Sequence, residues 1–166
     1  MQHIPYYSII LFGVLVYLGI KRCYARTIRP ARLFLFPVAM AVFGAPSLTK
    51  LFPAAAWQEF GALLVAVLVG AMLGWTHASR WQLEFDVSRG KVHVPGDPAL
   101  LALIIATYLV EFLVHYEVES RGTWANSELF LLFSFCAWGL LLGMSAGRAL
   151  NVLVRYCKSE AAFASN

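Results

Sequence analysis

Charged residues are scarce in this chain of 166 residues, of which they make up 13%. About 25% is usual for soluble domains. Apolar residues make up 60% of the chain, against about 45–50% in soluble domains. A soluble chain of this length cannot bury so many apolar side chains. A free-standing soluble domain is therefore nearly excluded, and so are a disordered chain, a collagen and a disulfide scaffold. The composition predicts an integral membrane protein.

The usual catalytic signatures are missing as well. The chain has no Gly-rich phosphate loop, no G-x-S-x-G nucleophile elbow and no H-E-x-x-H metalloprotease motif. Its four histidines are scattered along the sequence, which argues against a bis-histidine haem pair: they are His3, His77, His93 and His115. We therefore expect no catalytic residue, no metal and no cofactor, and the protein is predicted not to be an enzyme.

What the sequence has instead is long apolar runs. A helix needs about 20 apolar residues to cross a bilayer, with a range near 17–25. Five runs approach this length: 4–20, 33–48, 57–75, 98–116 and 129–147. The second is the shortest and contains Pro37 and Pro46, so we expect a kink at Pro37. We predict one domain over residues 1–166, an all-α bundle of five transmembrane helices. The alternative is a re-entrant second segment, which leaves four spans.

Basic residues orient this bundle, because they collect on the cytoplasmic side of a membrane. Eleven of the thirteen lie in three segments that five spans would put on one side: Lys21, Arg22, Arg26, Arg29 and Arg32, then Arg80, Arg89 and Lys91, then Arg148, Arg155 and Lys158. The other loops hold only Lys50 and Arg121. We expect the N-terminus outside and the C-terminus inside. The net charge of +4 then needs no nucleic-acid partner.

Cysteine is scarce too, with three residues in the chain. The predicted topology puts Cys23 and Cys157 on the cytoplasmic side and Cys136 within the membrane. No cysteine pair then faces the oxidising compartment. A thiol oxidoreductase acting on the outer face is therefore disfavoured.

The longest polar segment between the spans precedes the fourth. Residues 83–87 and 92–94 alternate apolar and polar side chains, and a turn sequence with Gly90 separates them. This pattern predicts a β-hairpin over about 82–95, on the cytoplasmic side. An isolated hairpin is marginal in water, so we expect the apolar side chains of 83–87 to rest on the bundle or on lipid headgroups. Asp97, followed by proline, predicts the N-cap of the fourth span.

Two of the predicted spans carry small residues at every fourth position. They are Ala62, Ala66, Gly70 and Gly74 in the third span, and Gly139, Gly143 and Gly147 in the fifth. Such stripes allow helix backbones to approach closely. We expect the third and fifth spans to pack on each other inside one bundle. The alternative is that a stripe forms the contact face of a homodimer.

One acidic residue stands well inside a predicted span. Glu111 lies in the fourth span, where an ionisable group is costly and is by default a functional-site hypothesis. His115 follows on the same helical face, and Glu119 continues the spacing if the helix extends. These three could relay protons, serve transport or bind a divalent metal. The plainer interpretation is a paired or hydrated Glu111 within reach of the interface.

A second candidate site is basic. Arg29, Arg32 and Arg148 stand at the inner ends of predicted helices and could form a rim that binds lipid headgroups or another anion. The plainer interpretation is that these arginines orient the chain and extend to lipid phosphates.

Three motifs resemble a known family. They are Arg-x-x-Arg-Pro-x-Arg-Leu at 26–33 followed by Phe36-Pro37, Gly-x-Val-x-Val-Pro-Gly at 90–96, and Gly-x-x-x-Gly-Arg-Ala-Leu at 143–150. They are similar to a family of small bacterial inner-membrane proteins, a domain of unknown function distantly similar to CcdC-type membrane proteins. The resemblance covers most of the chain. It implies a location in the bacterial inner membrane, where the N-terminus that the basic residues place outside would be periplasmic, and it implies no activity.

These patterns favour a non-enzymatic function. We expect a structural, accessory or assembly protein that acts in the lipid bilayer through helix–helix contacts, with another membrane protein or with a second copy. The alternative is a small transporter or channel component that uses Glu111 and His115. A membrane-embedded enzyme would need a polar cavity lined by several spans.

Overall fold

The computed structural model describes residues 13, 16–17, 19–21, 23–53, 55–120, 124 and 127–165. Four long helices make up most of this part of the chain: α2 (Leu35–Leu51), α3 (Trp57–Ser79), α4 (Pro98–Glu119) and α5 (Glu128–Ala164). The expected first span, 4–20, lies largely outside the described residues. The fold is thus mostly helical, with four of the five predicted spans observed as helices.

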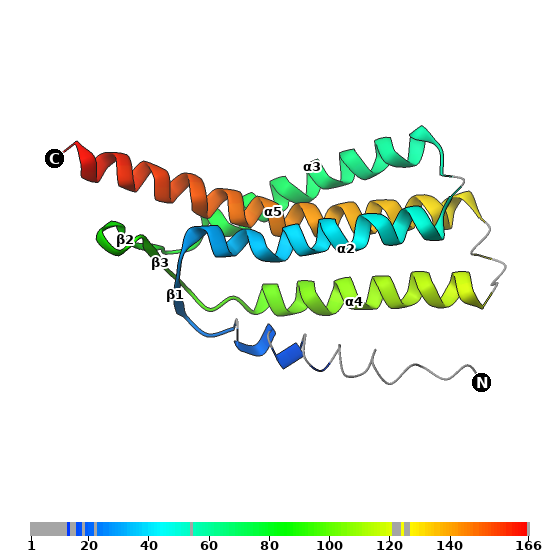
Figure 1. Cartoon of the computed structure of the whole chain (residues 1–166), viewed down its shortest axis with the longest axis horizontal. Coiled ribbons are helices and arrows are strands. Elements are labelled where there is room, and N and C mark those ends of the chain that lie inside the picture. The colour runs from blue at the N-terminus through cyan, green and yellow to red at the C-terminus, as the bar shows by residue number, and fades with distance from the viewer. Residues whose placement is uncertain are drawn as a thin grey trace.

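The four helices run along the long axis of the molecule (Figure 1). α2 and α4 lead from the end that carries the strands to the opposite end, and α3 and α5 lead back. Each helix coincides largely with a segment that is long and apolar enough to cross a membrane: Pro30–Leu51, Trp57–Ser79, Leu101–Glu119 and Glu128–Ala164. Successive helices therefore run in opposite directions, so that the chain passes from one end of the bundle to the other with each helix.

The second span begins in a short 3-10 helix, η1 (Pro30–Phe34), which leads directly into α2. Pro37 lies just after this change of helix type, and the kink expected there stays a prediction. The proline inside the helix is Pro46.

α5 is much longer than its predicted span. With 37 residues it reaches about 55 Å at 1.5 Å per residue, so it extends well past the ends of the other helices toward the C-terminus (Figure 1). The prediction stopped at 147 because basic residues follow, but these occupy continuing helical turns. Arg155 of this extension donates hydrogen bonds from Nη1 to the carbonyl oxygens of Ala78 and Trp81, 3.4 and 3.0 Å away, at the end of α3.

The largest helix–helix contact lies between α3 and α5, and the small-residue stripes form it. A Cβ built on Gly143 or Gly147 would collide with the carbonyl oxygen of Val67 or Ala71, respectively. From the other side, a Cβ on Gly70 or Gly74 would collide with carbonyl oxygens of α5. Gly139 approaches Ala66 in the same way. Both stripes are therefore occupied inside one chain and are not open to a second copy.

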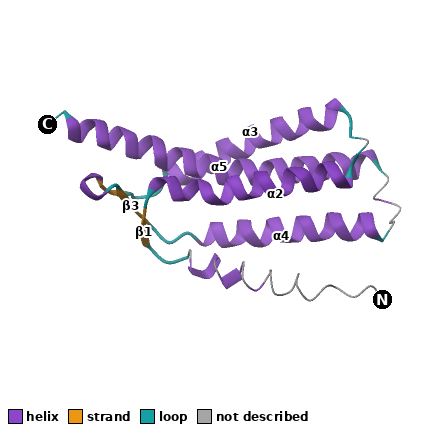
Figure 2. Ribbon diagram, viewed as in Figure 1, coloured by secondary structure: helices purple, strands orange, loops and turns teal. Residues whose placement is uncertain are grey.

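Strands gather at one end of the bundle, as Figure 2 shows in orange. The predicted hairpin is present as β2 (Glu84–Asp86) and β3 (Lys91–Val94). Gly90 between them has φ +61°, the left-handed conformation that glycine adopts without strain. The structure adds a third strand, β1 (Arg26–Ile28), which pairs antiparallel with β3 and gives the order β1-β3-β2. The prediction of a two-stranded hairpin is corrected accordingly, since three residues are too few to show strand alternation.

The sheet packs on α5 rather than standing free. Val92 and Val94 of β3 are buried against Val152 of α5, with Leu83 and Phe85 at the side. A second apolar cluster lies toward the opposite end, among Leu48, Phe52, Val114, Phe130, Phe135 and Trp138. The end of the bundle that carries the sheet and the opposite end are thus closed by different sets of apolar side chains.

Candidate functional site

The most buried charged residues lie where the sheet meets the helices. Asp97 is the N-cap of α4, and its Oδ1 accepts a hydrogen bond from the Ala99 N–H at 3.0 Å. Pro98 occupies the first turn, where its missing N–H costs nothing. The predicted N-cap is therefore confirmed. Its position fixes the Asp97 carboxylate at the start of the helix, where the helix dipole favours negative charge.

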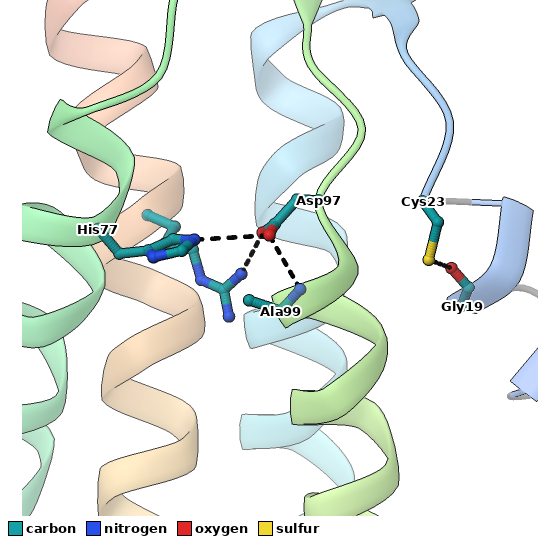
Figure 3. A network of polar contacts seen from close by, with 6 residues as sticks. Gly19, Cys23, His77, Asp97 and Ala99 are labelled. Atoms are coloured by element: carbon teal, nitrogen blue, oxygen red, sulfur yellow. Dashed lines mark hydrogen bonds and ion pairs between the residues drawn. The ribbon is translucent and has the colours of Figure 1, made fainter.

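Arg148 of α5 reaches this carboxylate. Its Nη1 donates to Asp97 Oδ2 at 2.6 Å, and the two side chains are only 5% and 9% exposed. His77 of α3 places Nε2 3.4 Å from Asp97 Oδ1. Figure 3 shows His77 and the Ala99 amide approaching Asp97 from different elements. We call Asp97, Arg148 and His77 the inner cluster; it joins α3, α4 and α5.

Burying two charges is expensive, and a buried pair persists only where the geometry and additional hydrogen bonds compensate. Asp97 has this compensation, since it receives hydrogen bonds from the Arg148 guanidinium and the Ala99 amide. Arg148 has less. Its Nε and Nη2 are buried and have no hydrogen-bond partner among the residues that the structure describes. The inner cluster therefore contains hydrogen-bond donors, the Nε and Nη2 groups of Arg148, that lack an acceptor in the described part of the chain.

A small pocket of about 40 Å³ adjoins the inner cluster. One water molecule needs about 10–15 Å³ of such space, so the pocket has room for about three water-sized groups. Its walls come from β1, α2, α5, the loop after α3 and the connection between β3 and α4, and include Arg26, Phe36, Trp81, Asp97, Ser145 and Arg148. The pocket is thus lined by polar side chains of the inner cluster, of β1 and of α5, and by apolar or aromatic side chains elsewhere.

Glu111 forms the centre of a second polar site, farther along α4. Its Oε1 accepts a hydrogen bond from Trp138 Nε1 of α5 at 2.8 Å. His115 lies one turn on, with Nδ1 2.9 Å from the Glu111 carbonyl oxygen and 3.5 Å from Oε2. The side chains of Glu111 and His115 are 30% and 43% exposed. We call Glu111, His115 and Trp138 the outer cluster.

The structure does not gather the other predicted site residues around these clusters. Glu119 is exposed at the end of α4, and no three His, Cys, Asp or Glu side chains of the described chain lie close enough to hold a metal ion. Arg29 and Arg32 are exposed near η1. Arg148 differs from them, because it is buried and paired rather than part of an exposed rim.

Sequence reasoning missed the pairing of Asp97 with Arg148. The signal was available, since both residues stand at the inner ends of predicted spans, which the five-span topology puts on the same side. His77 lies at that same end, in the last turn of α3. The partner of Glu111 was missed as well, because Trp138 lies inside an apolar span rather than near a boundary.

Comparison with known proteins supplies a family but no activity. Residues 1–164 match a family of unknown function (DUF6622), and the chain belongs to that family. No curated protein matches the chain. No solved structure matches it either. What this protein does must therefore be argued from its own residues.

Proposed function

We propose that this member of the family is a multi-pass membrane protein with a non-enzymatic role, an accessory or assembly component that acts through helix–helix contacts. The observation that carries the proposal is the apolar surface of α3. Leu64, Val65, Leu68 and Met72 are 58–70% exposed, although α3 already packs on α5. Exposed apolar patches of this kind mark membrane or protein contacts.

The position of α3 supports a role in assembly. Among the described elements its only extensive neighbour is α5, and it lies at the edge of the bundle in Figure 1. The side toward α5 carries the small residues, and the remaining sides carry large aliphatic side chains. A bilayer can cover these sides, and so can a helix of another membrane protein, which is the partner that we propose.

Cross-linking in native membranes tests this role. A photoreactive residue at Met72 of α3 should give one discrete protein adduct, and the same residue at Leu113 should serve as control, since that side chain is equally apolar and 52% exposed on α4. Adducts with lipid alone at Met72, and purification of the chain reproducibly without a partner, would contradict the proposal.

We further propose the orientation of the chain in a bacterial inner membrane, with the N-terminus periplasmic and the C-terminus cytoplasmic. The support is the excess of basic residues at the end that carries the sheet, among them Arg26, Arg89 and Lys91. After replacement of the native cysteines by serine, Ser88→Cys should react with an impermeant thiol reagent only in permeabilised cells. Ser120→Cys, also exposed but at the other end of the bundle, should react in intact cells. The reverse pattern would overturn this orientation.

A transporter or channel component is the second candidate, and the outer cluster favours it. Glu111 and His115 bring a carboxylate and an imidazole together on a mostly apolar helix, and both are partly exposed. If they carry protons, Glu111→Gln should abolish proton flux in reconstituted vesicles. Equal flux with the wild-type chain and with Glu111→Gln would exclude this role for Glu111.

A further inference from the structure

One face of α4 carries the outer cluster and is only partly covered by the described elements. Its side chains include Glu111 and His115, which are 30% and 43% exposed, and Phe112, which is 38% exposed. Another face of α4 packs on α2 and α5 through the buried Leu103 and Val114. Ionisable side chains inside a membrane span almost always face protein or a water-filled cavity rather than lipid. A further protein segment is therefore expected along the outer cluster.

The described end of the predicted first span packs on the start of this face. A Cβ built on Gly19 would lie 2.5 Å from Cδ1 of Leu101 and 3.6 Å from Cδ1 of Ile104, both on α4. Gly19 is buried, whereas Tyr17 and Ile20 beside it are 58% and 46% exposed. Figure 1 shows this helical piece, in blue, next to the first turns of α4. The described part of the first span therefore turns the side that carries Gly19 toward α4.

Helical periodicity extends this contact to the outer cluster. Side chains seven or eleven residues apart are separated by about two or three turns and share a helical face. From Ile104 these steps lead to Glu111 and His115, and from Leu101 the longer step leads to Phe112. The face of α4 that Gly19 contacts is therefore the face that carries the outer cluster.

The chain before Gly19 has the direction and the length to follow this face. The described piece leads into β1, at the end of the bundle that carries the sheet. A helix that continues before Gly19 therefore leads away from that end, antiparallel to α4. Fifteen residues of the predicted span precede Gly19, and fifteen residues of α4 follow Ile104. As helix, each of these segments measures about 22 Å, so the two lengths match.

We propose that the first span, residues 4–20, packs antiparallel on this face of α4 and encloses the outer cluster, with Ser8 beside His115. Ser8 precedes Gly19 by eleven residues, which places it on the same helical face about three turns away. The same step along α4 leads from the Gly19 contact to Phe112 and His115. A serine hydroxyl can form hydrogen bonds with an imidazole or a carboxylate. Glu111 and His115 then form a polar site between three helices and do not face lipid.

This inference rests on the membrane-spanning part of the proposed function, but it depends neither on the partner of α3 nor on the orientation of the chain. Recovery of the chain in the membrane fraction tests the membrane-spanning part by itself. The contact between the first span and α4 is tested separately, in the purified full chain in detergent. Failure of the contact and failure of the proposed function are therefore distinguishable.

Paired cysteines test the contact, after replacement of the native cysteines by serine. Ser8→Cys with Phe112→Cys should form an intrachain disulfide on mild oxidation, because facing positions of packed helices come within the range that a disulfide bridges. Leu113 stands at the same height on another face of α4 and is 52% exposed. Ser8→Cys with Leu113→Cys is therefore the matched control and should give a yield about fivefold lower. Mass spectrometry of the linked peptides measures both yields. Equal yields, or a disulfide between two copies, would overturn the proposal.

The two glycines of the described piece test where the span is held. Gly19→Leu would collide with Leu101 and push the span from α4, so the yield of the Ser8–Phe112 disulfide should fall severalfold. Gly13→Leu is the matched control, because nothing lies within 4 Å of a Cβ at that position. Its yield should change by no more than about twofold. Equal yields in the two variants would contradict the contact at Gly19.

Lipid access gives a second measurement, which needs no disulfide. A fluorophore on a single cysteine at Phe112→Cys should be shielded from brominated phospholipid in reconstituted vesicles, because the first span covers this position. The same fluorophore at Leu113→Cys should be quenched severalfold more strongly, since that side chain is on the lipid-facing side of α4 in this arrangement. Equal quenching at the two positions would overturn the proposal.

Discussion

The inner and outer clusters show two ways of keeping an acid inside an apolar bundle. Asp97 is almost fully buried and is met by a guanidinium from another helix and by the Ala99 amide at the start of its own helix. Glu111 is partly exposed and is met by a neutral indole N–H and by a histidine on its own helix. A deeply buried carboxylate requires an opposite charge, whereas the less buried Glu111 is paired with a neutral donor. The inner cluster should therefore dominate stability.

The largest expected effect is the loss of the buried cation. Arg148→Met keeps most of the side-chain volume but leaves Asp97 charged and without its partner, which costs about 3–5 kcal/mol. The melting temperature of the purified chain should fall accordingly. Arg32→Met, an equal change at an exposed site, should leave it nearly unchanged. Similar melting temperatures for the two variants would contradict the ranking of the clusters.

The next effect should alter the inner cluster and leave the outer cluster unchanged, because α3 contributes a residue to the inner cluster alone. In Gly143→Ala the new methyl group would collide with the Val67 carbonyl oxygen and push α3 from α5, at a cost of about 1–3 kcal/mol. Spectroscopic signals of His77 should change while those of Trp138 stay constant. Gly61→Ala on α3 is the matched control, because nothing lies within 4 Å of its new Cβ. That variant should be stabilised by up to about 1 kcal/mol.

A smaller effect is expected in the outer cluster. Trp138→Phe removes the hydrogen bond to Glu111 but keeps most of the ring, so the folded state should lose about 1–2 kcal/mol. Glu111→Gln keeps an acceptor for the indole and should cost less. Thermal melting of both variants measures this order. A larger loss in either than in Arg148→Met would reverse the comparison.

The smallest effect concerns an acid outside the helices. A hydrogen bond from the Ser88 hydroxyl, 2.6 Å from Asp86 Oδ1, lowers the pKa of Asp86, and the nearby Arg89 and Lys91 add to this shift. Because the pKa of Asp86 is lower in the folded chain than in the unfolded chain, its carboxylate stabilises the hairpin at pH values above the unfolded-state pKa. This stabilisation is lost as the pH falls through the folded-state pKa. Ser88→Ala should therefore raise the pKa of Asp86 toward its ordinary value, as NMR titration of the carboxyl carbon would show. An unchanged titration would contradict the assigned cause.

Much of the fold could be predicted from the sequence, because apolar length is a strong signal. Helices α2 to α5, the hairpin around Gly90 and the N-cap at Asp97 follow from runs, alternation and turn residues. β1 could not be predicted, since a three-residue strand is recognisable only from its pairing with β3. The end of α5 was placed too early, because charged residues end an apolar run without ending a helix.

The site was less predictable, because it consists of pairs between helices. Glu111 was identified by its position inside a span, but its partner Trp138 lies 27 residues away in another helix. Arg148 was identified as a basic residue at a helix end, and its burial depends on Asp97, which is 51 residues distant. Position in a span is readable from one segment of the chain. To predict which residue pairs with it, one must also know how two helices are placed relative to each other along the bundle axis.

The coupling between Asp97 and Arg148 tests the central claim most directly. The free energy of unfolding should be measured for the wild-type chain, for Asp97→Asn, for Arg148→Met and for the double variant, in the same detergent. Because the two side chains interact directly, the double variant should be more stable than the sum of the single losses predicts, by about 1–3 kcal/mol. Additive losses would contradict the claim that this buried pair holds the inner end of the bundle together.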